Sequence, residues 1–213
     1  LEKLGQAFDK FYMFVGNHDL YYKDKRDVTS TIFGKHIPGI TIVDEIYEEE
    51  DVALVPWLVG DEWKKIQKCK AKYMFGHFEL PHFYMNAMVQ MPEHGDLRAE
   101  HFENQEYVFS GHFHKRQVKG KIHYIGNSFP HNYADAWDDE RGMMILDREN
   151  NKEPEYLNWG NCPKYRTIKL SHLLDKTDEV MKAKMYLRVT LDLPISFEEA
   201  SFIKETFFKD FKC

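Results

Sequence analysis

The sequence predicts an α/β fold, or α+β in schemes that separate the two classes, because one local pattern occurs three times along its 213 residues. In each case an apolar run typical of a buried strand ends at or beside a glycine, and residues able to bind metal or move protons follow. The three segments are residues 11–19, 72–77 and 106–114. Ligands bind at the carboxyl ends of strands in open α/β sheets. We therefore expect the three strand ends to form one site.

The composition is that of a globular protein, with 43% hydrophobic and 15% aromatic residues. No apolar run is long enough to cross a bilayer and the chain opens on no secretion signal, so we expect a cytoplasmic protein without a membrane partner. The three cysteines, Cys69, Cys162 and Cys213, are odd in number and far apart, which favours reduced thiols. The net charge of −6 does not indicate nucleic-acid binding by bulk electrostatics.

The remaining elements follow from periodicity and turn residues. Residues 1–11 show helical spacing and lead into a strand at 12–15, whereas the polar stretch 21–29 predicts a loop. A short basic helix is expected at 63–72, and residues 80–104 predict a long loop with a helical piece. Further strands are expected at 40–43, 52–57, 117–118 with 121–125, 142–147 with 155–159, and 184–193.

The carboxyl-terminal stretch predicts one more strand and one more helix. Residues 184–193 alternate apolar and polar side chains, as a half-buried strand does. Ser196 and Glu199 form a capping box. The helix that follows has one apolar face, formed by Phe197, Ala200, Ile203, Phe207 and Phe211. We expect one domain over residues 1–182 and the beginning of a second over 183–213.

Four residues at the strand ends have the chemistry of metal ligands, namely Asn17, His77, His112 and His114. Neutral imidazoles and an amide oxygen suit a first-row divalent ion such as Mn²⁺, Fe²⁺ or Zn²⁺. Residues two apart in an extended segment point the same way, so His112 and His114 could reach one metal centre or two adjacent ones. A lone histidine is more often structural, but this combination favours a metal site.

His18 and Asp19 are better suited to catalysis than to metal binding. A histidine beside metal ions can protonate a leaving oxygen, and a neighbouring aspartate can fix its tautomer. The alternative for Asp19 is a turn or helix cap.

The basic run at residues 115–121 directly follows the two histidines of the third segment. Lys115 and Arg116 are its first members and could hold phosphate groups beside a metal site. A solvated turn explains the run equally well.

Residues 16–19, 76–77 and 111–114, in this order, resemble motifs of the calcineurin-like metallophosphoesterases. That resemblance implies a β-sandwich flanked by helices, with two metal ions at the strand ends. Residues 55–57, 126–130 and 139–142 resemble, more specifically, the SbcD-type DNA repair nucleases, and in particular the recombination endonuclease subunits of T-even-like bacteriophages. The resemblance covers residues 1–182, and the final strand and helix match the start of the family's α/β DNA-capping domain.

The resemblance implies a nuclease subunit that hydrolyses DNA phosphodiester bonds by two-metal catalysis in recombination and repair. The implied cofactor is two Mn²⁺ ions, with Mg²⁺, Fe²⁺ or Zn²⁺ as alternatives. His77 and His112 would bind one ion with Asn17, His114 would bind the other, and His18 supported by Asp19 would assist the departing oxygen. The implied partners are DNA, a second copy of the chain and an SMC-like coiled-coil ATPase subunit, in bacterial or phage-infected host cytoplasm.

One departure from the family pattern limits this expectation. The family also uses an Asp-x-His and a Gly-Asp-x-x-Asp motif upstream of Asn17, and neither occurs in the sixteen residues before it. The chain opens on leucine, so we expect an amino-terminally truncated copy with half of the metal ligands and little or no activity alone. Two alternatives stay open, namely a metallophosphoesterase acting on phosphoproteins or small phosphodiesters, and a non-catalytic scaffold with a decayed site.

Overall fold

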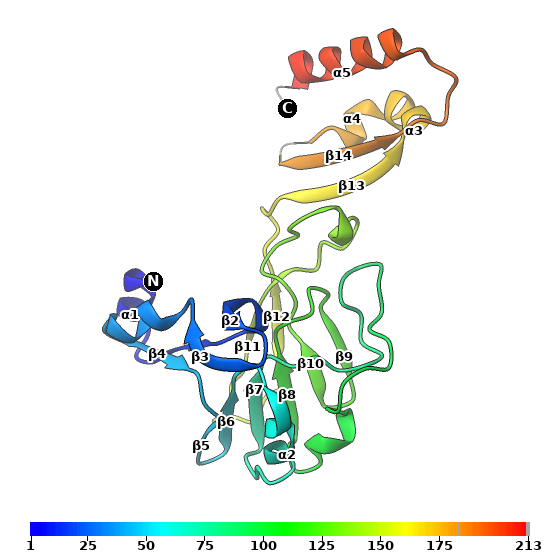
Figure 1. The fold of residues 1–213 in the computed structure, drawn as a ribbon. Helices are drawn as coiled ribbons and strands as arrows, with labels where there is room; N and C mark the ends of the chain where they lie inside the picture. The colour runs from blue at the N-terminus through cyan, green and yellow to red at the C-terminus, as the bar shows by residue number, and fades with distance from the viewer. Residues whose placement is uncertain (183, 212–213) are drawn as a thin grey trace.

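The computed structural model describes residues 1–182 and 184–211 and shows a mixed α/β fold built on a six-stranded sheet (Figure 1). The strand order is β5–β6–β7–β8–β10–β9, in which the four inner strands run parallel and the two edge strands run antiparallel to their neighbours. The strands are β5 (Tyr47–Glu49), β6 (Val52–Val55), β7 (Tyr73–Gly76), β8 (Tyr107–Ser110), β9 (Gln117–Lys119) and β10 (Ile122–Tyr124). The α/β prediction is confirmed at this level, and all but β5 lie where the sequence predicts strands.

The amino-terminal segment forms a second, smaller sheet beside the first. Helix α1 (Glu2–Ala7) leads into β1 (Phe11–Phe14), which pairs in parallel with β4 (Ile40–Val43). Ile40 and Ile42 of β4 are buried together with Val15. The amide of Trp57 donates to the carbonyl of Val15 at 2.8 Å, which joins the end of β1 to the segment that follows β6.

The loop prediction for residues 21–29 is wrong, because β2 (Leu20–Tyr22) and β3 (Lys25–Thr29) form an antiparallel hairpin there. This polar segment can form strands because Arg26 has partners in the fold. The Arg26 guanidinium binds both carboxylate oxygens of Glu62 and also donates to the carbonyls of Asp44 and Trp57. Those partners lie 18 to 36 residues away in the sequence, so local polarity alone does not indicate them.

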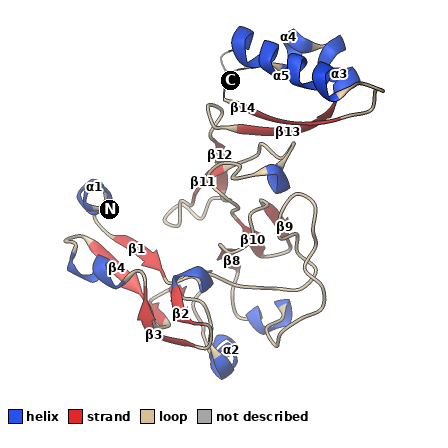
Figure 2. Ribbon diagram, turned by 45° about the horizontal axis from the view of Figure 1, so that its top comes forward, coloured by secondary structure: helices blue, strands red, loops and turns tan. Residues whose placement is uncertain are grey.

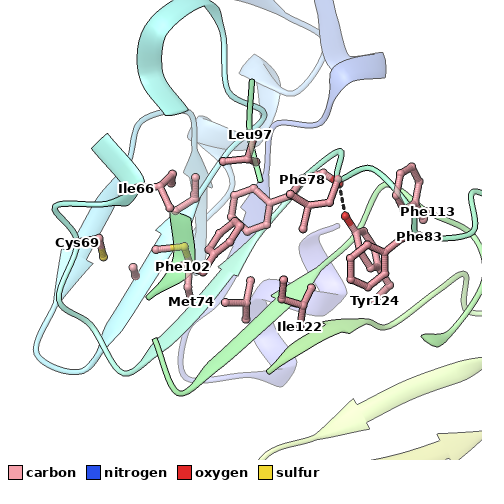
Figure 3. Packing of buried hydrophobic residues seen from close by; sticks show 14 of the residues in the cluster. Ile66, Cys69, Met74, Phe78, Phe83, Leu97, Phe102, Phe113, Ile122 and Tyr124 are labelled. Carbon is pink, nitrogen blue, oxygen red and sulfur yellow. Dashed lines mark hydrogen bonds between the residues drawn. The ribbon is translucent and has the colours of Figure 1, made fainter. Parts of the chain in front are cut away.

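The main hydrophobic core packs against the six-stranded sheet, and Figure 3 shows its central side chains. Phe78 and Phe102 meet edge to face at 5.1 Å between ring centroids, and the Tyr124 hydroxyl donates to the carbonyl of Phe78. The expected long loop over residues 80–104 contributes Leu80, Phe83, Met91 and Leu97 to this core. Its expected helical piece is the 3₁₀ helix η4 (Ala99–Phe102).

Helix α2 (Trp63–Ile66) is shorter than the basic helix expected over residues 63–72. The chain leaves the helix because the amides of Lys70 and Ala71 donate to the carboxylate of Glu48 at the sheet edge. The hairpin predicted after residue 141 is present as β11 (Gly142–Ile145) and β12 (Glu155–Asn158).

The carboxyl-terminal segment has a hydrophobic cluster of its own. Strand β13 (Lys164–Lys169) pairs in parallel with β14 (Met185–Thr190), and α3 (Leu170–Asp175), α4 (Thr177–Val180) and α5 (Phe197–Phe211) lie on the same side of this pair (Figures 1 and 2). Ile168, Leu170 and Leu173 form the buried centre of the cluster, against which Ile203 and Phe207 pack.

The capping box of α5 is confirmed. The amide of Ser196 donates to the Glu199 carboxylate at 2.8 Å, and the amide of Glu199 donates to the Ser196 hydroxyl at 3.1 Å. The apolar face is only partly covered, because Phe197 and Phe211 are exposed. The domain division between residues 182 and 183 stays a prediction, and Ala183 lies outside the described residues. Residues 164–182 on one side of that division pack with β14 and α5 on the other.

Two further sequence predictions concern thiols and membranes. Cys69 and Cys162 are buried free thiols, and burial raises the pKa of Cys69 to about 11, whereas Cys213 lies outside the described residues. No helix within residues 1–182 and 184–211 has the length and apolar character needed to cross a bilayer.

Candidate metal centre at the strand ends

The ends of β7 and β8 lie side by side because the two strands are neighbours in the sheet, with Gly76 opposite Ser110. The amide of Gly111 donates to the carbonyl of Gly76 at 3.0 Å, which keeps the two chains together beyond the last paired residues. The end of β1 leads into the 3₁₀ turn η1 (Asn17–Asp19). The fold therefore delivers His77, His112 and Asn17 from three different segments.

These three side chains meet. The Asn17 amide oxygen Oδ1 lies 3.0 Å from His77 Nε2 and 3.3 Å from His112 Nδ1. The two imidazole rings are 5.1 Å apart between centroids. The convergence of one oxygen and two nitrogen atoms is the geometric centre of the candidate site.

The glycines that end the strands leave space for the ring of His77. A Cβ added at Gly16 would lie 3.0 Å from His77 Cε1, and one added at Gly111 would lie 3.2 Å from His77 Nδ1. Both distances are tighter than ordinary van der Waals contact. The apolar-glycine-histidine pattern of the sequence thus has a steric basis in this packing.

Burial keeps the histidines neutral at pH 7. Desolvation, followed by the charge of His112, lowers the pKa of His77 to about 4. Desolvation also lowers the pKa of His112, against the opposing effect of Glu79, and lowers the pKa of His114. Neutral imidazoles have the free lone pair that a metal ion requires.

His18 is exposed and lies in η1 directly after Asn17. Asp19 instead accepts from the amide of Gly16 at 2.8 Å and from the hydroxyl of Ser30 at 2.9 Å. That is the geometry of the cap that the sequence offered as the alternative. Support of His18 by Asp19 stays a prediction.

His114 follows His112 by two residues, and its surroundings differ from those of Asn17, His77 and His112. Its ring is 5.7 Å from that of His131, and its carbonyl accepts from the amide of Asn127 and the guanidinium of Arg141. Arg141 is fully buried and pairs with Asp135 and Asp138. These hydrogen bonds hold the backbone of His114 in place, and its ring packs against that of His131.

The donor set fits one divalent ion of the first transition row. Asn17 Oδ1, His77 Nε2 and His112 Nδ1 are three neutral donors converging on one place, as such ions accept. In the described part of the chain, no three histidine, cysteine, aspartate or glutamate side chains lie together so as to hold a metal ion. The candidate centre consequently depends on the amide oxygen of Asn17.

Two side chains that contact this centre were not predicted as site residues, although Trp57 belongs to the motif at residues 55–57. The Trp57 ring lies 5.1 Å from that of His112 and 6.0 Å from that of His77, and Glu79 Oε2 lies 3.0 Å from His112 Nε2. Glu79 stands two residues after His77, so the alternation rule could have indicated it. Trp57 follows β6, a third neighbouring strand end, but no polar group marks it.

The basic side chains of residues 115–121 contact other groups of the protein. Lys115 lies 3.5 Å from Asp138, and the Arg116 guanidinium lies over the Tyr156 ring and donates to Asn158. Lys119 and Lys121 donate to backbone carbonyls. The proposed phosphate contacts of Lys115 and Arg116 would require both side chains to exchange these partners.

The fold and the strand-end centre define a mixed α/β protein with a candidate metal site, and comparison with known proteins adds one relationship. No family model matches the chain. The sequence is 27% identical over 162 residues to exonuclease subunit 1 of Enterobacteria phage T4. The match covers 71% of this chain and 46% of the phage protein, so the chain spans about half the length of that relative. The expected distant relationship to a phage nuclease subunit is confirmed.

Proposed function

We propose that the chain is part of a nuclease subunit that hydrolyses phosphodiester bonds of DNA, on a metallophosphoesterase β-sandwich fold. The observation that carries the proposal is the meeting of Asn17, His77 and His112 in a chain that is similar to a phage exonuclease subunit. The proposal includes action as exonuclease and endonuclease in recombination and repair.

Asn17, His77 and His112 would hold one divalent ion, and His114 would contribute to a second. Mn²⁺ is the proposed ion, with Mg²⁺, Fe²⁺ or Zn²⁺ as alternatives. When bound, such ions supply Lewis-acid stabilisation of negative charge on a phosphate. The protein contributes the neutral, desolvated imidazoles, and the ring of Trp57 lies against that of His112.

His18 is the proposed proton donor to the departing oxygen. It is exposed in η1 directly after Asn17, a proposed metal ligand, so a substrate phosphate at the centre would lie near it. Asp19 holds the turn in place through Gly16 and Ser30. Lys115 and Arg116 are the proposed contacts to phosphates further along the strand.

The remaining proposals concern assembly. By analogy with nuclease subunits of the resembled family, we propose a homodimer, an SMC-like coiled-coil ATPase partner and a DNA-capping role for the carboxyl-terminal segment. The described residues supply three neutral donors to the centre and no bridging carboxylate. We therefore expect this chain alone to bind one ion weakly and to cleave DNA slowly or not at all.

The test is DNA cleavage by the complete gene product with Mn²⁺, with and without a chelator. Linear duplex DNA should be degraded, and His18→Ala should lower kcat by about 10²- to 10⁴-fold without weakening Mn²⁺ binding. His172→Ala, at an exposed histidine of α3, is the matched control and should leave kcat unchanged.

Two other results would replace the proposal. Intact duplex DNA together with rapid hydrolysis of a small phosphodiester would favour the phosphodiesterase alternative. Neither cleavage nor Mn²⁺ binding by the complete gene product would favour a non-catalytic scaffold.

A further inference from the structure

Glu79 is a carboxylate that contacts the candidate metal centre from outside it. Its Oε2 lies 3.0 Å from His112 Nε2, on the side of the ring away from Asn17, and its Oε1 lies 3.8 Å from His94 Nε2. The His112 side chain is 11% exposed and that of Glu79 is 28% exposed. The contact is therefore largely shielded from competing water.

The carboxylate determines which ring nitrogen of His112 has the proton. An ionised carboxylate can only accept a hydrogen bond, so His112 Nε2 must be the protonated nitrogen. His112 Nδ1 then has a lone pair, and it faces Asn17 Oδ1, a second acceptor, at 3.3 Å. Two acceptors cannot bond to each other, but a cation between them satisfies both.

We propose that Glu79 is a positioning residue that holds His112 in the tautomer protonated at Nε2 and so presents its Nδ1 lone pair to a divalent cation beside Asn17. The inference rests on the proposed metal site and adds a residue to it. A carboxylate behind a metal-binding histidine fixes the ring and increases its basicity, and its loss typically weakens metal affinity 10- to 100-fold.

The backbone already determines where the ring of His112 lies. His112 has φ of +77°, and the amide of Phe113 donates to the carbonyl of Gly111 at 3.1 Å, which closes a γ-turn around His112. Phe113 is buried in the main core and anchors the turn. Removal of Glu79 should accordingly change the tautomer of His112 more than its position.

The first experiment measures that tautomer by NMR of metal-free chain with ¹⁵N-labelled histidine at pH 7.5. In the wild-type chain His112 should be protonated at Nε2. Glu79→Met keeps the length of the side chain and removes the acceptor, so His112 should become protonated at Nδ1 and donate to Asn17 Oδ1. Glu79→Gln keeps one acceptor and should restore a larger fraction of the Nε2-protonated form than Glu79→Met.

The second experiment titrates the same chains with Mn²⁺ alone by calorimetry. The Glu79→Met affinity should be 10- to 100-fold lower than that of the wild-type chain. Glu93→Gln is the matched control, because Glu93 is a carboxylate of the neighbouring loop that pairs with His82 at 2.8 Å and Arg98 at 2.7 Å. It should change neither the His112 tautomer nor the Mn²⁺ affinity.

Three results would overturn the inference. These are a wild-type His112 protonated at Nδ1, a tautomer that is the same in the wild-type and Glu79→Met chains, and an Mn²⁺ affinity that Glu79→Met leaves unchanged. The proposed function can fail independently of the role of Glu79. If Glu79→Met shifts the tautomer and weakens Mn²⁺ binding while the complete gene product leaves DNA intact, the role of Glu79 stands and the nuclease proposal does not.

Discussion

His123 shows how burial and aromatic packing determine the protonation of a single side chain in this protein. It lies on β10 at 7% exposure, between the rings of Tyr107, Phe109 and Tyr156. The hydroxyl of Tyr156 forms a hydrogen bond with His123 Nδ1 at 2.6 Å. Desolvation lowers the pKa of His123 below its usual 6.5.

The stability of the chain should therefore depend on pH through His123. Below pH 6.5 the unfolded chain binds a proton at His123 that the folded chain does not bind. The unfolding free energy therefore falls as the pH falls, and the stabilising contribution of the neutral His123 is fully present above pH 6.5. His123→Phe should make this pH dependence less steep in urea unfolding of metal-free chain between pH 7.5 and 5. The exposed His36→Gln is the control, and equal slopes for the wild-type and His123→Phe chains would contradict the prediction.

At the scale of one element, the turn after β10 fixes the backbone of His114. Gly126 has φ of +78°, and a Cβ there would lie 2.7 Å from the His114 carbonyl oxygen and 2.8 Å from the Arg116 amide nitrogen. The next residue, Asn127, donates its amide to the same carbonyl at 3.0 Å. Only glycine allows this close approach of the two chain segments.

Gly126→Ala should therefore destabilise the chain by about 3 kcal/mol, since it combines left-handed backbone strain with backbone contacts that cannot yield. Gly120→Ala is the matched control, because Gly120 also has a positive φ, of +57°, but an added Cβ meets no atom within 4 Å. It should lose only about 1 kcal/mol. Urea denaturation measures both values, and equal losses would show that strain alone matters at Gly126.

Some strands could be predicted from the sequence and others could not. Strands β6, β7 and β8 are central and buried, so their apolar runs identify them. Strand β13 escaped prediction because Tyr165 and Ile168 are the only apolar residues among its six, and its buried Arg166 depends on Asp139, 27 residues earlier. A local pattern does not contain such a partner.

The candidate site, like the fold, was predictable from the sequence where it depends on local patterns and not where it depends on distant contacts. The histidines that follow glycines could be assigned to one cluster because parallel strand ends meet at one sheet edge. The contact of Glu79 with His112 spans 33 residues, and the ring of Trp57 lies beside His112 only after the loops have folded. These two contacts therefore became visible only in the structure.

For the whole molecule, the main division is between two hydrophobic clusters. The larger contains Phe102 and packs against the six-stranded sheet, and the smaller contains Leu173 and packs between β13–β14 and the helices that cover them. Figure 1 shows the second group, coloured yellow to red, beyond the end of the first. Segments with separate cores can open separately.

We expect the two clusters to lose stability independently. Phe102 is fully buried and Leu173 is 3% exposed, so Phe102→Ala and Leu173→Ala should each remove about 2–5 kcal/mol from their own cluster. Hydrogen exchange followed by mass spectrometry should show faster exchange in β13, β14 and α5 for Leu173→Ala while β6, β7 and β8 stay protected. Phe102→Ala should give the reverse. If either variant accelerates exchange equally in both groups of strands, the chain unfolds as one cooperative unit and the expectation of independent clusters is wrong.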